Sequence, residues 1–192
     1  MLAPVLITPP ESHPVTLAEA KAHLRVDDND SDALITSLIG AASNYLDGYT
    51  GILGRALVTQ SWRQDFAGFS HSLCLPLAPV STVSAVKYID TAGTEQTLPS
   101  SVYQLLHVAR GAAVVLRPGQ SWPQTRSQLD AVRVEFVAGV PVEDVPAAVK
   151  HAMLLLIGHW YENRESVAVG AAPTVLPMAF SALIAPFRYV GI

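Results

Sequence analysis

The sequence predicts an α+β protein in which a helical body, built from N- and C-terminal helices, carries an inserted small antiparallel β domain. Apolar residues recur at spacings of three and four in the flanking parts of the chain, whereas within residues 57–140 they alternate with a period of two. The alternating runs are short and are separated by turn-forming residues, which favours antiparallel pairing. We therefore expect an extended arm at 1–14, a helical body from 15–56 and 141–186, a β insertion at 57–140 and a C-terminal tail at 187–192.

The longest amphipathic stretch lies at residues 145–164 and is expected to form the principal helix. Pro146 suits a first helical turn, where its missing N–H would have no partner, and Asp144 can cap that end. The apolar stripe consists of Val149, Ala152, Met153, Leu156, Ile157, Trp160 and Tyr161. Leu154 and Leu155 fall outside this stripe, so the helix is apolar around most of its circumference. Such a helix is either buried in its own domain or shared with a neighbouring subunit.

Two N-terminal helices are expected before the β insertion. Thr16 with Glu19 three residues later is a capping box, which predicts a short helix that ends near Val26. A second helix is expected over residues 32–49, with Gly51 as its stop signal.

The acidic run at residues 27–32 suggests a calcium-binding loop, but the rest of that pattern is missing. Counted from Asp28, Ala33 stands where the loop needs glycine and Ile39 where it needs glutamate. We therefore interpret the run as a solvated turn that supplies an acidic first turn to the next helix.

The β insertion is expected to hold strands near 57–66, 83–89, 95–98, 103–108, 112–116 and 131–137. Residues 90–93 and 109–111 have the composition of hairpin turns. Pro76 and Pro79 indicate an irregular link around Leu77.

The C-terminal part of the chain contains a featureless loop at 166–177 and then a short helix from Pro177 through Ala185. Pro186 ends that helix, and residues 187–192 form an apolar, aromatic tail with one positive charge. A tail this apolar is expected to pack on something.

Composition excludes several classes of protein. Half of the 192 residues are hydrophobic, which is enough for a core that needs no disulfides or metal ions to stabilise it. Cys74 is the only cysteine, so there is no intramolecular disulfide framework, and its apolar neighbours indicate a packing role. The net charge of -4 argues against a broad basic face that grips nucleic acid. Neither a signal peptide nor a run of about 18 apolar residues is found, so we expect a soluble protein made in the cytoplasm.

Catalytic and metal-binding patterns are also missing from the sequence. His159 and Glu162 lie three residues apart on the principal helix, and His151 lies eight residues before His159. There is no HExxH pattern, so core or interface histidines are the better interpretation. No G-x-S-x-G elbow, phosphate-binding loop or dinucleotide motif is found. We therefore predict no catalytic, cofactor-binding or metal-binding residues and no enzyme activity, a profile that is typical of an assembly component.

Five segments of the sequence together resemble the head-tail connector (adaptor) proteins of tailed bacteriophages, prophages and gene transfer agents. They are VTLAEAKAHLRVDDNDSDALITSLIGAASNYLDGYTG, RALVTQSW, LPLAPVSTVSAVKYID, VRVEFVAG and VPAAVKHAMLLLIGHWYENRE. The likeness covers most of residues 15–190.

The resemblance implies a structural virion protein of the particle neck, at the head-tail interface, made in a bacterial host. It implies a ring of about twelve copies whose lumen lets double-stranded DNA pass without specific binding. The implied partners are further copies of the chain, the portal protein and a stopper or tail-completion protein, with no membrane involved. The candidates for portal docking are Phe187, Arg188, Tyr189, Val190 and Ile192, and those for the subunit interface are Leu154, Leu155, Trp160 and Tyr161. A binding module that uses the β segment as its platform and a hydrolase are the alternatives.

Overall fold

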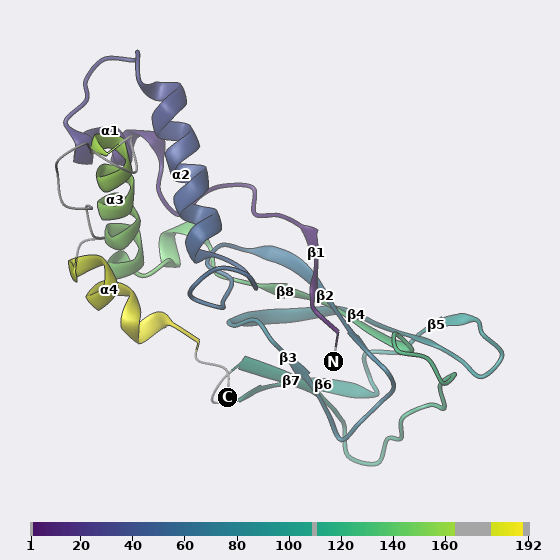
Figure 1. The fold of residues 1–192 in the computed structure, drawn as a ribbon. Helices are drawn as coiled ribbons and strands as arrows, with labels where there is room; N and C mark the ends of the chain where they lie inside the picture. The colour runs from purple at the N-terminus through teal and green to yellow at the C-terminus, as the bar shows by residue number, and fades with distance from the viewer. Residues whose placement is uncertain (1, 109–110, 164–177, 190–192) are drawn as a thin grey trace, which may run out of the picture. The chain divides into compact units, whose positions relative to one another are not determined.

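The structure is a computed structural model that describes residues 2–108, 111–163 and 178–189. It combines helices with two antiparallel sheets, which confirms the predicted α+β fold class (Figure 1). The chain forms two compact units: Ser12–Gly54 with Val142–Ile192 is helical, and Met1–Glu11 with Arg55–Pro141 is the β unit. In the described residues, no helix is long and apolar enough to cross a bilayer.

Helix α3 (Ala147–Glu162) is the central element of the helical unit, because it contacts each of the other helices. These are α1 (Leu17–Leu24), α2 (Asp32–Leu46) and α4 (Met178–Ile184), with short 3-10 turns at Val142–Asp144 and Ala185–Phe187. Figure 1 shows α2 beside α3. The side chains of α3 that are buried are Val149, Ala152, Met153, Leu156 and Ile157. They match most of the predicted stripe, and Pro146 serves as the N-cap rather than the first helical residue.

The predicted capping box at the start of α1 is present. The Thr16 backbone N–H donates to Glu19 Oε2 at 2.7 Å, and the Glu19 N–H donates to Thr16 Oγ1 at 3.2 Å. Two N–H groups that the first helical turn cannot satisfy thus find acceptors.

Helix α2 ends at Leu46, three residues earlier than the sequence predicts. The chain turns back on the helix end, where the Ile52 N–H donates to the Tyr45 carbonyl at 2.9 Å and the Leu53 N–H to the Leu46 carbonyl at 3.3 Å. Gly51 allows this return, since a Cβ there would collide with the backbone of the last helical turn. The glycine thus shapes the loop after the helix instead of marking the helix end.

The β unit contains two sheets whose strands all pair antiparallel, as the short spacings predict. The five-stranded sheet has the order β1 (Val5–Thr8), β2 (Gln60–Phe66), β8 (Val132–Ala138), β4 (Val80–Ile89) and β5 (Glu95–Thr97). The three-stranded sheet has the order β3 (Ser72–Leu75), β7 (Gly111–Leu116) and β6 (Tyr103–Val108).

The core of the β unit is built by both sheets. Strand β8 buries Val132, Val134 and Phe136, while the intervening residues are half-buried, so the predicted alternation is confirmed. The three-stranded sheet adds Leu73, Leu75, Tyr103, Ala112 and Val114 to the same apolar cluster. Each sheet therefore covers an apolar face of the other.

Two strands were not predicted, and the interpretation of Cys74 is wrong. Residues Val5–Thr8, within the expected extended arm, form β1, which pairs with β2. Strand β3 directly precedes the predicted irregular link around Leu77, which the structure leaves without a strand. Its alternation buries Leu73 and Leu75 but turns Cys74 to the exposed side, so Cys74 is not a packing residue.

The two ends of the β segment that lies between α2 and α3 meet each other. Val58 and Val140 form an isolated parallel bridge, in which the Thr59 N–H donates to the Val140 carbonyl at 3.0 Å and the Val140 N–H to the Leu57 carbonyl at 3.2 Å. Gly139 has a positive φ of 94° and leaves no room for a Cβ against Val58. Only glycine suits this position without strain.

We predict that Gly40→Ala stabilises the protein, because nothing lies within 4 Å of the position that a Cβ would take in the interior of α2. The expected gain in the free energy of unfolding is about 0.5–1 kcal/mol, measured by urea denaturation. Gly51→Ala is the matched control and should cost about 1–3 kcal/mol through overpacking. A loss of stability in Gly40→Ala would contradict this assignment.

We also predict that the capping box makes part of the stability pH-dependent. The hydrogen bonds from Thr16 lower the pKa of Glu19, so its stabilising effect is present above the unfolded pKa and is lost as pH falls through the folded pKa. Thr16→Ala should cost about 1 kcal/mol near neutral pH and less once the pH has fallen well below 4.5, the ordinary value of a Glu pKa. Thr16→Ser, which keeps the acceptor oxygen, should behave like the wild type in the same denaturation series.

Candidate assembly surfaces

The four residues proposed for a subunit interface all lie on α3 and are all half-buried. Trp160 packs edge-to-face with Tyr45 of α2, with ring centroids 6.2 Å apart. The Tyr161 hydroxyl lies 3.1 Å from Ser31 Oγ, at the start of α2. Both aromatic residues thus contact their own helical unit, which leaves Leu154 and Leu155 as the better interface candidates.

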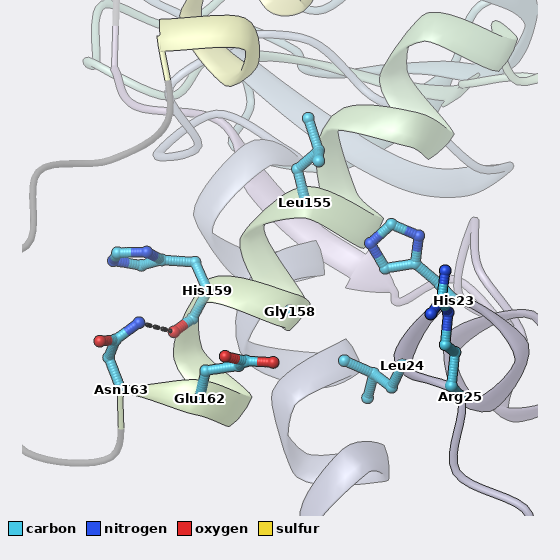
Figure 2. A pocket seen from close by; sticks show the side chains of 8 residues that line it. All are labelled: His23, Leu24, Arg25, Leu155, Gly158, His159, Glu162 and Asn163. Carbon is cyan, nitrogen blue, oxygen red and sulfur yellow. Dashed lines mark hydrogen bonds between the residues drawn. The ribbon is translucent and has the colours of Figure 1, made fainter.

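Leu155 lines a pocket of about 510 Å³ between α1 and α3 (Figure 2). Leu24 contributes a second apolar wall, and the polar lining consists of His23, Arg25, His159, Glu162 and Asn163.

His151 is not brought together with His159 and Glu162, the three residues considered for a metal site. His159 and Glu162 both line the pocket, but His151 packs edge-to-face with His23 at a centroid distance of 6.1 Å. Across the described residues, no three His, Cys, Asp or Glu side chains are close enough to hold a metal ion.

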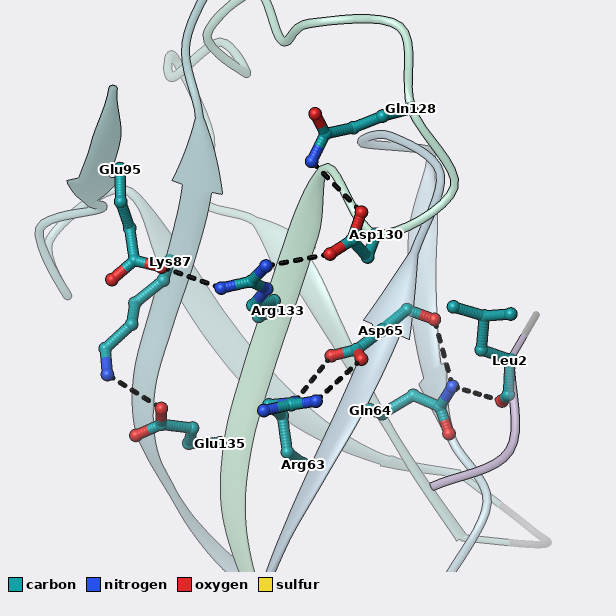
Figure 3. Close-up of polar contacts among 10 residues, drawn as sticks. All are labelled: Leu2, Arg63, Gln64, Asp65, Lys87, Glu95, Gln128, Asp130, Arg133 and Glu135. Atoms are coloured by element: carbon teal, nitrogen blue, oxygen red, sulfur yellow. Dashed lines mark hydrogen bonds and ion pairs between the residues drawn. The ribbon is translucent and has the colours of Figure 1, made fainter. Parts of the chain in front are cut away.

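One face of the five-stranded sheet carries a set of ion pairs, of which Lys87–Glu135 and Arg133–Glu95 join different strands (Figure 3). Lys87 Nζ lies 2.7 Å from Glu135 Oε1, and Arg63 Nε lies 2.9 Å from Asp65 Oδ1. Arg133 bridges two acids, with Glu95 at 2.9 Å and Asp130 at 2.7 Å.

The main effect of these ion pairs is to neutralise charge on this face of the sheet, and their effect on stability is smaller. The hydrogen bond from Arg133 lowers the pKa of Asp130, and the hydrogen bond to Glu135 raises the pKa of Lys87, so each pair favours its charged form. Exposed pairs of this kind typically contribute little to stability because solvent and salt screen them. Their main effect is that Arg63, Lys87 and Arg133 are each neutralised by a carboxylate. These ion pairs were not predicted, and their only signal in the sequence is the charged residues that alternate along β2 and β8.

The described part of the proposed docking tail is attached to the helical unit. Phe187 closes the last 3-10 turn and is half-buried, while the Arg188 and Tyr189 side chains are exposed. The Tyr189 backbone N–H donates to the Leu53 carbonyl at 2.7 Å. Val190 and Ile192 lie outside the described residues. Tyr189 is thus 37% exposed while its backbone is fixed to Leu53.

The chain is similar to a known protein family and to chains in solved structures. Residues 14–72 match the family of phage gp6-like head-tail connector proteins. No curated protein sequence matches the chain. A chain in the neck of an empty GTA particle, computed with C6 symmetry, has 25% identity and a TM-score of 0.77 over 100% of this chain and 97% of that one.

Two further structures have the same fold. A chain in the virion of a native gene transfer agent (GTA) particle has 24% identity and a TM-score of 0.77. A chain in the neck of a native GTA particle, computed with C12 symmetry, has 22% identity and a TM-score of 0.72. Each comparison covers 100% of this chain and 97% of the other. The resemblance found in the sequence is therefore confirmed: this chain is similar to phage head-tail connector proteins at residues 14–72 and has the fold of GTA neck proteins throughout.

Proposed function

We propose that this chain is a structural head-tail connector, or adaptor, in the neck of a phage, prophage or gene transfer agent particle, and not an enzyme. The observation that carries the proposal is the likeness to a GTA neck protein over the whole chain, at a TM-score of 0.77. In this function the chain forms a ring between the portal and the tail components. We propose about twelve copies, a number compatible with the C6 symmetry of the related neck because twelve is a multiple of six.

The charge distribution supports a ring through which DNA passes without being held. Phosphate binding requires clustered basic groups that are free to replace counterions. This chain has a net charge of -4, and the basic residues on the charged sheet face are ion-paired. A lumen built from such a protein would not retard DNA electrostatically.

The tail at 187–192 is proposed to dock on the portal protein. Its described part offers the exposed Arg188 and Tyr189 side chains at a fixed position on the helical unit. Repetition around a ring would make many weak contacts act together, so each tail needs only low affinity.

The direct test of the proposed function is the oligomeric state of the purified protein and of particle necks. Light scattering after size exclusion and negative-stain microscopy should show closed rings. A protein that remains monomeric at every concentration and does not enter particles would contradict the proposal and would favour a binding module.

We predict that Leu155→Glu blocks ring formation but leaves a folded monomer. Leu155 is half-buried beside the pocket, and a charge buried at a subunit contact costs several kcal/mol, on the order of 3–5, when it has no partner. Ala147→Glu, on an exposed position of the same helix, is the matched control and should still form rings. Loss of the helical circular dichroism signal in Leu155→Glu would instead assign Leu155 to the core.

We further predict that removal of residues 187–192 leaves a folded protein that no longer joins portal-bearing capsids. Co-sedimentation with capsids that lack this protein measures the attachment. A second variant, Tyr189→Ala, keeps the backbone hydrogen bond to Leu53 and tests the side chain alone. Normal attachment of the truncated protein would show that docking uses another surface.

A further inference from the structure

Strand β1 is an exposed and uncharged edge of the five-stranded sheet. Its one neighbour in the sheet is β2, and all four of its residues are exposed. Val5, Leu6 and Ile7 keep 43%, 42% and 48% of their surface accessible. Edge strands carry unpaired backbone N–H and C=O groups, which proteins usually protect with charges, prolines or bulges. Within β1, the one protective feature of this kind is an irregular register between Leu6 and Thr8.

The edge is held in place by the rest of the β unit. Val5 pairs with Arg63, and Leu6 with Trp62. The Gln64 side chain, which is fully buried, donates through Nε2 to the Leu2 carbonyl at 2.7 Å, as Figure 3 shows. Because the strand is already ordered, a partner that adds to it pays little conformational entropy.

Strand β6 is a second edge of the same kind. It borders the three-stranded sheet, pairs with β7 on one side, and contains no Asp, Glu, Lys or Arg. Leu106 is 44% exposed and Val108 is 51% exposed.

The other two edges of these sheets expose little apolar surface. Strand β5 is a three-residue polar strand whose Glu95 is ion-paired. Strand β3 is also uncharged, but Leu73 and Leu75 are buried and its exposed residue is Cys74. Among the described strands, the edges that expose large aliphatic side chains are therefore β1 and β6.

We propose that β1 of one copy pairs edge-to-edge with β6 of the neighbouring copy in the connector ring. This inference rests on the proposed function, which makes a second copy of the chain the occupant of each edge. Cyclic rings need head-to-tail contacts, in which each subunit offers two different surfaces. β1 and β6 are two such surfaces, because each lacks a hydrogen-bonding neighbour on one side and each exposes aliphatic side chains.

Three lysine substitutions at exposed positions test the pairing. Ile7→Lys places a charge on β1, and Leu106→Lys places one on β6. Leu129→Lys is the matched control, because Leu129 is 73% exposed but lies outside the strands. Circular dichroism confirms that each variant is folded, and light scattering measures its mass at the concentration where the wild type forms rings.

The expected result is a ring for Leu129→Lys and monomers for Ile7→Lys and Leu106→Lys when each is alone. An equal mixture of the two monomeric variants should form heterodimers, because one intact β1 edge and one intact β6 edge remain in that pair.

Three results would overturn the pairing while the ring itself stands. They are rings in either edge variant, homodimers of a single variant, which would indicate β1–β1 or β6–β6 pairing, and a mixture that stays monomeric. A wild type that never forms rings overturns the proposed function, and the edge pairing falls with it.

Discussion

The burial of one face of α3 is the contact on which the helical unit depends. Val149, Met153, Leu156 and Ile157 are fully buried there, and α1, α2 and α4 all pack on the same helix. Removal of any of these side chains would leave a cavity shared by several helices, which neighbouring atoms could fill only in part. Because this face serves the core, a subunit contact on α3 would have to use what the helix leaves outside it, and Leu154 and Leu155 are such positions.

Sequence reasoning succeeded where a local pattern carries the structural information. The capping box at Thr16 and Glu19, the stripe of α3 and the alternation of β8 each depend on residues close together in the chain. The end of α2 was placed too late, because the backbone groups that return from Ile52 and Leu53 cannot be inferred from helix spacing. β1 was missed because prolines flank it and its exposed residues leave no alternating pattern.

The candidate surfaces were predictable to different degrees. Leu154 and Leu155 stood out because they break the spacing of the stripe, whereas Trp160 and Tyr161 matched the stripe but contact Tyr45 and Ser31. The ion pairs Lys87–Glu135 and Arg133–Glu95 depend on which residues lie near each other across strands, and one strand's sequence does not contain its register. Local chemistry can thus be predicted from the sequence, while pairwise electrostatics requires the fold.

The bridge between Val58 and Val140 has a consequence for how the helical unit can form. Helices α2 and α3 contact each other although the long β segment separates them in sequence. Once that segment has folded, its joined ends act as a short tether, and the entropy lost on bringing α2 to α3 falls by about 0.6 kcal/mol for each halving of the effective loop length. The folding order with the lowest entropic cost is therefore the sheet first and the helices second. Gly139 lies at the position where the long loop is closed into a short one.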